Sequence, residues 1–383
     1  MTSPAVAIVR SDPRPDIAHL REAVRQAMDL AGGFDIAPGA RVLIKPNLVA
    51  TPPTPESGAC TSAAVCRALC DVIVDLGGSP FIAESSARGI DTEEVMRFMG
   101  YSALKDEGYE VIDLKRTERV HVPVPDGVVL EEVTTWRPVV EADAIVSVPV
   151  LKTHDQTDTS LSLKNLKGLV IDADKRRIHQ VGVFQGVCDL IRLFKPAFAL
   201  IDGLIGQEGL GPVFGLPVEM GLLIAGRDLL AVDAVGSAAI GFAPEEVRLL
   251  TIAAERGLGS LALDEIEVRG ERLTDVSRRF LRMEEDSRIA LEGIEILHAE
   301  GTCTGCRNGI LSSLFDMIQA ETVAEARGVV LVTGDALPGA GIPPDQVVPV
   351  GICCPEALRA HSRYVPGCPP NNVDIVNAIR GNR

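Results

Sequence analysis

The sequence predicts an α/β protein with a doubly wound, mainly parallel sheet, followed by a second and smaller α/β unit. Three observations support this fold class. Short segments rich in Val, Ile and Leu alternate with amphipathic segments along most of the chain, as in βαβ units. The 383 residues exceed the usual size of one hydrophobic core. Aromatic residues make up only 4%, which suits a sheet of aliphatic strands buried on both faces.

The elements predicted for the first unit alternate along the chain. Strands are predicted where apolar runs end in polar loops, at residues 41–49, 80–84, 109–114, 144–151, 198–202 and 221–225. Helices are predicted where apolar residues recur at helical spacing, at residues 61–76, 92–99, 229–240 and 244–256. The segment 144–151, AIVSVPVL, is the strongest strand signal in the chain.

A charge-rich stretch with little strand character, residues 264–288, separates the two predicted units. We therefore expect an N-terminal α/β substrate-binding domain at residues 1–270 and a C-terminal α/β domain at residues 285–383. The elements predicted in the second domain are strands at 293–298, 328–333 and 347–351, and helices at 308–320 and 372–379.

The overall charge limits the partners and location that we expect. A formal charge of −16 disfavours nucleic acid and anionic lipid surfaces. No run of eighteen apolar residues is present, so no membrane span is expected. The first residues lack the apolar centre of a signal peptide, which predicts a cytoplasmic protein. An oligomer is compatible with all of these features.

Five of the nine cysteines lie in the last ninety residues, where structural disulfides are not expected in a cytoplasmic protein. Cys303 and Cys306 form a C-x-x-C pair, Cys353 follows a predicted strand, and Cys368 precedes a predicted helix. Proline commonly follows cluster-binding cysteines, and helix N-termini stabilise thiolates. These four cysteines predict a [4Fe–4S] cluster, with Cys354 as an alternative third ligand.

Two other interpretations of the cysteines stay open. A C-x-x-C pair alone fits a redox dithiol, although that leaves three further cysteines unexplained. Four cysteines also fit a structural zinc site, although such sites usually pair two C-x-x-C motifs and this chain has one.

The ordered set CTGC, Gly351-Ile-Cys353 and GCPPN resembles the proximal-cluster ligands of the nickel–iron hydrogenase small subunit. The GCPP element is also similar to one in the cluster-bearing subunit of respiratory complex I. The resemblance implies a [4Fe–4S] cluster on a flavodoxin-like domain, with Cys303, Cys306, Cys353 and Cys368 as ligands. The large-subunit nickel site is missing from the sequence, so hydrogenase activity is not implied.

A second resemblance covers about residues 40–255. The segments RVLIKPNL (41–48), SGACT (57–61), ESSARG (84–89), VPVLKTH (148–154), SLKNLKG (162–168) and AGRDLLAVDAV (225–235) resemble a large bacterial family known only as domain-of-unknown-function family 362. This resemblance implies a fold and an association with redox proteins, but no reaction.

Four lysines, Lys45, Lys152, Lys164 and Lys167, lie in or beside loops that follow apolar strands. In open α/β sheets ligands bind beyond the carboxyl ends of the strands. Lysines at that edge suit a carboxylate or phosphate ligand. We also expect the segment 162–168 to open a helix whose backbone N–H groups face an anion.

A lysine beside carboxylates can act as an acid or base if its pKa is shifted, and histidine can carry a proton. The predicted catalytic residues are Lys152, His154 and Lys45. The predicted substrate-binding residues are Asn47, Lys164, Asn165, Lys167, Glu84, Asp202 and Glu208. The charged stretch 172–179 is expected to be an exposed, mobile lid.

Together these features predict a [4Fe–4S]-dependent oxidoreductase that acts on an anionic small molecule and receives electrons from a ferredoxin-type donor. Two alternatives remain. One is a lyase in which an open iron site acts as a Lewis acid. The other is a non-catalytic electron carrier or zinc-stabilised binding protein.

Overall fold

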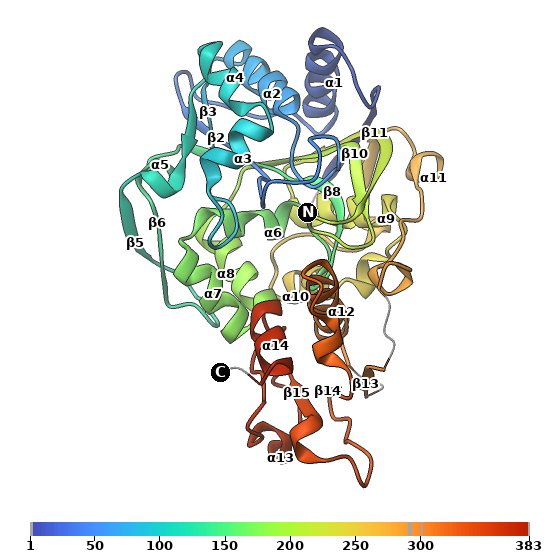
Figure 1. Cartoon of the computed structure of the whole chain (residues 1–383). Coiled ribbons are helices and arrows are strands. Elements are labelled where there is room, and N and C mark those ends of the chain that lie inside the picture. Colours follow the sequence, from blue (N-terminus) through green and yellow to red (C-terminus); the bar gives the residue numbers. More distant parts are fainter. Residues whose placement is uncertain (1–2, 290–292, 300–301, 382–383) are drawn as a thin grey trace.

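The computed structural model describes residues 3–289, 293–299 and 302–381. Figure 1 shows a large unit, which extends from β1 (Ala5–Arg10) to α11 (Leu273–Val276), and a smaller C-terminal unit attached below it. The predicted C-terminal domain, 285–383, includes residues 290–292, 300–301 and 382–383, which lie outside the described residues.

The large unit is built on one mainly parallel sheet, as predicted. Its central path has the order β12-β1-β11-β10-β7-β2-β3-β4, in which β10, β7, β2, β3 and β4 are parallel and β11 runs antiparallel to both neighbours. The strands are β1 (Ala5–Arg10), β2 (Arg41–Pro46), β3 (Ser79–Glu84), β4 (Val111–Asp113), β7 (Ala144–Val148), β8 (Val150–His154), β9 (Asp158–Thr159), β10 (Phe198–Glu208), β11 (Leu216–Gly226) and β12 (Glu267–Gly270). A separate hairpin pairs β5 (Arg119–Pro123) with β6 (Glu132–Trp136).

Both faces of this sheet are covered by helices. Successive side chains of a strand point to opposite faces, and Val42 and Ile44 accordingly belong to one hydrophobic core while Leu43 belongs to the other. The first core takes side chains from α1 (Ile17–Leu30), α2 (Ala63–Asp75), α3 (Thr92–Phe98) and α4 (Tyr101–Asp106). The second takes them from α5 (Arg137–Val140), α6 (Ser162–Asn165), α7 (Asp172–Val181), α8 (Val183–Phe194), α9 (Leu229–Ala239), α10 (Arg248–Glu255) and α11 (Leu273–Val276).

The predicted strand 144–151 is divided in the structure. Pro149 interrupts it because proline has no N–H to donate to a sheet. β7 pairs with β2 and β10, whereas β8 pairs with β10 and β9. This break moves the chain beyond the carboxyl edge of the central strands, so β8 carries Lys152 and His154 above the edge of the sheet.

The expectation of a mobile lid at residues 172–179 is wrong. This stretch forms most of helix α7, in which Asp174, Lys175 and Ile178 are buried. Ile178 packs in the second core, and Asp174 accepts a hydrogen bond from Thr134 N at 2.7 Å. Although most of its residues are charged, the segment is an amphipathic helix, and Lys175 lies on its buried face.

The C-terminal unit is a three-stranded parallel sheet in the order β13 (Glu295–His298), β14 (Val330–Thr333), β15 (Val347–Val350). Helices α12 (Thr304–Gln319) and α14 (Asn372–Ile379) pack on one face of it, and α13 (Glu356–Arg359) lies on the other side with Leu358. The flavodoxin-like description of this unit stays a prediction.

The segment between the units packs largely on the large unit. Phe280 is fully buried in the second core, and its backbone N–H bonds to Ile240 O at 3.0 Å. β12 pairs with β1 in the large sheet. The exact domain limits remain a prediction. Among the described residues, no helix combines the length and apolar character needed to cross a membrane.

Candidate active site

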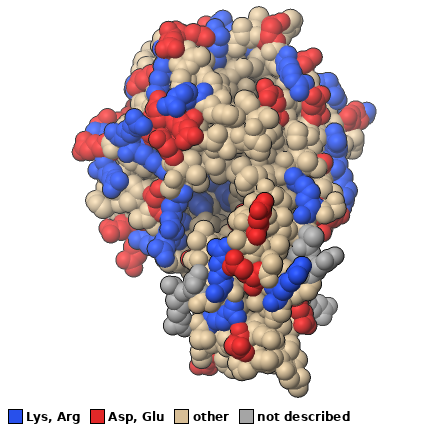
Figure 2. Space-filling model, viewed as in Figure 1, with Lys and Arg blue, Asp and Glu red and all other residues tan. Residues whose placement is uncertain are grey.

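A cavity of about 440 Å³ lies beyond the carboxyl ends of β2 and β3 and next to β8, between the two units. The chain leaves β2 toward β3 on one side, while β7 lies on the other, so the strand order reverses at this point. Such switch points are the usual ligand crevices of open α/β sheets. Figure 2 shows this hollow above the C-terminal unit, with basic residues at its base. Helices α12 and α14 contribute one wall.

Lys45 is buried and its ammonium group is fully used by the protein. Its Nζ donates to Glu84 Oε2 at 2.5 Å, to Pro46 O at 2.6 Å and to Asn165 Oδ1 at 2.8 Å. Burial lowers its pKa, and the Glu84 carboxylate opposes that shift. A side chain on Gly168 would collide with Glu84 and Lys45, which explains the glycine that ends SLKNLKG. Because an ammonium group has three donors, Lys45 is a structural cation here.

Lys152 is saturated in the same way. Its Nζ donates to Ala59 O at 2.6 Å, Asn47 Oδ1 at 2.7 Å and Pro212 O at 3.1 Å. Burial lowers the pKa of Lys152 to about 8. Thus Lys45 and Lys152, both predicted to be catalytic, lie at the cavity but hold its loops together.

Lys175, on α7, is the third saturated lysine. Its Nζ donates to Ser86 O at 2.7 Å, to Ser85 Oγ at 2.8 Å and to Ser85 O at 2.9 Å. Burial lowers its pKa to about 8. This residue was missed at the sequence level because it lies within the charged stretch 172–179. Only its position on the inward face of α7 could have indicated it.

Lys164 and Lys167 differ from these three. Among the described residues, Lys164 Nζ has no hydrogen-bond partner, and Lys167 Nζ contacts only His179 Nε2, at 2.7 Å. Burial lowers the pKa of Lys167 to about 7, with Lys175 adding to the effect. Burial also lowers the pKa of Lys164 well below its ordinary value, and the Lys167 and Lys152 charges contribute. These two lysines retain unused donors at the cavity.

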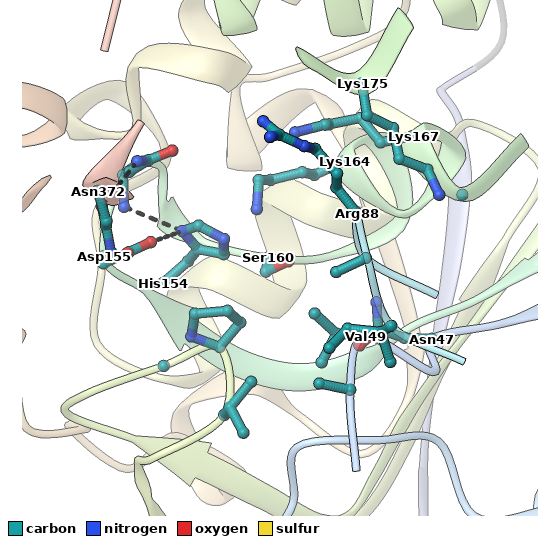
Figure 3. Close-up of a pocket in the computed structure, with 18 of the residues that line it drawn as sticks. Asn47, Val49, Arg88, His154, Asp155, Ser160, Lys164, Lys167, Lys175 and Asn372 are labelled. Atoms are coloured by element: carbon teal, nitrogen blue, oxygen red, sulfur yellow. Dashed lines mark hydrogen bonds and ion pairs between the residues drawn. The ribbon is translucent and has the colours of Figure 1, made fainter. Parts of the chain in front are cut away.

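His154 and Asp155 lie next to each other on the opposite side of the cavity, and Asp155 Oδ1 has no hydrogen-bond partner among the described residues. His154 Nδ1 lies 2.6 Å from Asp155 Oδ1 and accepts the N–H of Gln156 at 2.9 Å. Burial lowers the pKa of His154 to about 4, so its imidazole is neutral at pH 7. Asn372 Nδ2, from α14, approaches Asp155 Oδ2 at 3.5 Å. Figure 3 shows Lys164, Lys167, Lys175 and Arg88 gathered away from this pair.

The remaining predicted binding residues divide into two groups. Asn47, Asn165 and Glu84 line the cavity. Asp202 and Glu208 do not. Asp202 accepts the backbone N–H groups of Ser62 and Leu204, and Glu208 accepts that of Leu281. Both carboxylates therefore hold loops rather than face the cavity.

The expected anion site at the start of the segment 162–168 is also occupied by the protein. Asp233 on α9 accepts the backbone N–H groups of Ser162 and Leu163 at 2.7 and 2.9 Å. Burial raises the pKa of Asp233 to about 7. The helix start thus has its own carboxylate, whereas Lys164 and Lys167 of the same segment line the cavity.

The cysteines gather at the inner end of the C-terminal unit. Cys303 is the N-cap residue of α12, and the neighbouring Cys306 thiol lowers the pKa of the Cys303 thiol, with the backbone N–H groups of Cys306 and Gly305 adding to the effect. Burial raises the pKa of the Cys368 thiol, and the neighbouring thiols of Cys303 and Cys353 raise it further. Cys354 instead turns into the core, where its thiol approaches Val350 O at 3.4 Å.

Glycine at position 351 leaves room for a sulfur atom. Gly351 has φ +96°, and a Cβ there would lie 2.8 Å from Cys306 Sγ. The Gly-x-Cys motif therefore places bare backbone against one thiol and the exposed Cys353 two residues later. Within the described part of the chain, no group of three or more His, Cys, Asp or Glu residues is arranged to hold a metal ion. The four-cysteine ligand set remains a prediction.

Comparison with known proteins identifies the family. The family model described as "Domain of unknown function (DUF362)" matches residues 42–238. The chain belongs to the DUF362 family. The match spans the predicted lysines and Asp233, and it confirms the resemblance drawn from the N-terminal motifs. The C-terminal cysteine loops of this DUF362 protein lie outside the match.

Two individual proteins are also similar. The thylakoid-associated protein sll1697 of Synechocystis sp. is 28% identical over 264 residues, covering 67% of this chain and 79% of the relative. The lactate racemase apoprotein from Thermoanaerobacterium thermosaccharolyticum has 12% identity and a TM-score of 0.38, over 87% of this chain and 69% of the racemase. At that TM-score the racemase adds nothing to the assignment of the site.

Proposed function

We propose that this DUF362 protein is an iron–sulfur oxidoreductase that acts on a small organic anion, a carboxylate or phosphate, bound between its two units. The observation that carries the proposal is the pair Lys164 and Lys167, two lysines with unused donors at a cavity. Because the pKa of Lys167 is about 7, its ammonium form is present near neutral pH, and an anion can accept hydrogen bonds from the unused donors of both lysines.

The charge around the cavity supports an anion. Among the described residues it is lined by seven Lys and Arg side chains but only three Asp and Glu side chains, although the whole chain carries −16. Three of the lysines are saturated, which leaves Lys164, Lys167, Arg88 and Arg176 for the ligand. A local excess of positive charge in an acidic protein concentrates small anions there.

The cysteines are connected directly to this cavity. Cys368 N donates to His179 O at 3.2 Å, and Cys368 O accepts from Val183 N at 2.8 Å. His179 lines the cavity and contacts Lys167. In the proposal, Cys303, Cys306, Cys353 and Cys368 hold a [4Fe–4S] cluster, on a flavodoxin-like unit, that supplies single-electron transfer.

The exposed position of Cys353 suits an external donor of the ferredoxin type, which would approach on that side. The cytoplasmic location expected from the sequence belongs to this proposal too. The chain's own residues bind and orient the anion through the free lysines, while the saturated lysines hold the loops that shape the cavity.

The test is the iron, sulfide and zinc content of protein purified without oxygen. We expect about four irons and four sulfides per chain. The variants C303S, C306S and C368S should lose the cluster, whereas C354S should retain it because its thiol is turned into the core. One zinc without sulfide would overturn the proposal and favour a zinc-stabilised binding protein.

The exposure of Cys353 also keeps the Lewis-acid lyase as a second candidate. A ligand at the surface is the one whose absence would leave an iron open to substrate. Cluster retention in C353S, with unchanged iron content, would favour the lyase. Cluster loss in C353S would favour complete cysteine ligation and electron transfer.

A further inference from the structure

Lys164 is set apart from the other lysines at the cavity by its hydrogen bonding. Lys45, Lys152 and Lys175 each have at least three acceptors, and Lys167 has one. Among the described residues, Lys164 Nζ has none. Figure 3 shows its side chain extending into the cavity from the side on which Lys167 and Arg88 lie. Its amine is therefore free to react.

The surroundings of Lys164 favour its neutral amine. It lies three residues before Lys167, so both side chains lie on the same side of one short helical segment. Burial and the nearby Lys167 and Lys152 charges lower the pKa of Lys164 well below its ordinary value. An ordinary lysine is neutral in only about one molecule in 2,500 at pH 7. Lysines desolvated beside another cation are a known form of activated nucleophile.

The neighbouring groups fit a substrate with a carbonyl next to an acid group. Lys167 can hold a carboxylate, and the carbonyl carbon beside that carboxylate would then lie near Lys164. The remaining cavity wall includes Leu48, Val49 and Phe214, which would accept an apolar side chain. In Figure 3, Val49 lies across the cavity from the lysines.

We propose that Lys164 Nζ forms an imine with the carbonyl carbon of a 2-oxo acid whose carboxylate is bound by Lys167. This rests on the anion site of the proposed function but not on the cluster. The amine adds to the carbonyl carbon, and a C–N bond forms. The two amine protons then leave with the carbonyl oxygen as water, which leaves a C=N bond. No electrons are exchanged, so no oxidant or reductant is needed for this step.

The experiment is reductive trapping at pH 7 with pyruvate and sodium cyanoborohydride, followed by intact mass and peptide mapping. We expect one N-carboxyethyl group per chain, located on Lys164. Labelling there should exceed that of the exposed Lys195 by about tenfold or more, because the cavity would hold the pyruvate carbonyl beside the free Lys164 amine. Lactate, which lacks the carbonyl group, should give no label.

Two variants sharpen the test. K164R replaces the amine by a guanidinium group, which does not form the imine, so the label should disappear while the thermal unfolding midpoint shows that the protein is folded. K195R should label as the wild type does. Equal labelling of Lys164 and Lys195, or a dominant label on another cavity lysine, would overturn the inference. Both outcomes are measured on the wild-type protein, so the test does not depend on the folding of K164R.

Sulfate separates this inference from the proposed function. If sulfate suppresses labelling of Lys164, both the imine and the anion site are supported. Labelling that sulfate leaves unchanged supports the imine on Lys164, but it contradicts the anion site and overturns the binding of the carboxylate by Lys167. Because trapping requires no cluster, iron and sulfide content is an independent result, and failure of the cluster proposal would leave this one standing.

Discussion

At the scale of single residues, the lysines at the cavity fall into two groups that the sequence alone does not distinguish. Lys45 and Lys152 follow strands and looked like the best candidates for catalysis, yet their three donors are already used within the protein. Lys164 and Lys167 retain free donors. The number of acceptors around each ammonium group, rather than its position after a strand, separates structural lysines from those available to a ligand.

The first residue-scale prediction concerns pH and anion binding. The pKa of Lys167 is lowered to about 7, so its positive charge is present below that pH and is lost above it. Sulfate keeps a constant charge over this range. We therefore expect sulfate affinity to fall by up to about tenfold between pH 6 and 8, because the charged fraction of a group with a pKa of about 7 falls from about 0.9 to about 0.1 over that range. The sulfate affinity at each pH is measured by isothermal titration calorimetry.

The control for this prediction is K167R, whose guanidinium stays charged across the range. Its sulfate affinity should change less with pH than that of the wild type. Lys164, Lys175 and Asp155 also lie near Lys167 and are unchanged in this variant. A wild-type affinity that is constant from pH 6 to 8 would show that Lys167 does not bind the anion.

The second residue-scale prediction concerns stability. The Lys45–Glu84 pair is almost fully buried, with side chains 1% and 3% exposed. K45M leaves the Glu84 carboxylate without its cation, so we expect a loss of about 3–5 kcal/mol in the free energy of unfolding, measured with urea. K105M breaks the more exposed Lys105–Glu93 pair and should cost about 1 kcal/mol or less. Equal losses in the two variants would contradict this account.

At the scale of elements, α9 holds the segment that presents the two free lysines. Asp233 binds the first backbone N–H groups of α6, and the chain then continues through the short 3-10 turn Leu166–Leu169. A four-residue helix is not stable alone, because helix nucleation is unfavourable. Its position therefore depends on this tertiary bond more than on its own sequence.

This dependence predicts that D233A weakens both stability and sulfate binding. Two buried N–H groups lose their acceptor, and we expect a loss of about 1–3 kcal/mol in the free energy of unfolding. The matched control is D228A on the same helix. Asp228 is the N-cap of α9 and accepts from Ala231 N and Ser260 N, away from α6. D228A should lower stability but leave sulfate affinity unchanged, and weakened binding in both variants would count against the specific role of Asp233.

At the scale of the whole molecule, the site exists because the two units meet. The cavity takes its floor from the sheet of the large unit and one wall from α12 and α14. The contact combines the packing of Phe315 of α12 on Leu210 and Phe214 with polar bonds. These include Gln156 Nε2 to Pro370 O at 3.1 Å and Thr304 Oγ1 to Asp158 Oδ2 at 2.8 Å. In the proposed function, this contact between the two units would place the cluster beside the bound ligand, and α12 and α14 would cover one side of the cavity.

A weaker contact between the two units should be measurable by amide hydrogen exchange in α14. Q156A removes the bonds to Pro370 O and Asn372 Oδ1, and we expect amides of α14 to exchange about fivefold to tenfold faster, as about 1 kcal/mol is lost. Exchange in β2 and β7 should not change. Q185A, which removes a bond to Arg256 inside the large unit, should leave α14 as in the wild type. Unchanged amide exchange of α14 in Q156A would mean that other contacts hold the two units together.

The local pattern of residues was sufficient to predict many elements and the outline of the site, although β1, α1, α8 and the β5–β6 hairpin were not among the predicted elements. Helix 372–379 was predicted at its observed bounds, and β2, β3 and α2 differ by only a few residues. These succeed because side-chain periodicity directly reflects burial. Asn47, Asn165, Lys164 and Lys167, taken from the motifs after the strands, line one cavity, because parallel strands bring their carboxyl ends to one edge; their role in binding a substrate stays a prediction.

Only the tertiary structure decided what each of these groups has available. Asp202 and Glu208 hold loops, Asp233 occupies the start of α6, and Lys175 enters the cavity from a helix that looked like an exposed lid. Hydrogen-bond partners come from positions distant in the chain, such as Lys45 and Asn165, so no local pattern reveals them. Which donors remain free is a property of the packed molecule, and it is this property that marks Lys164.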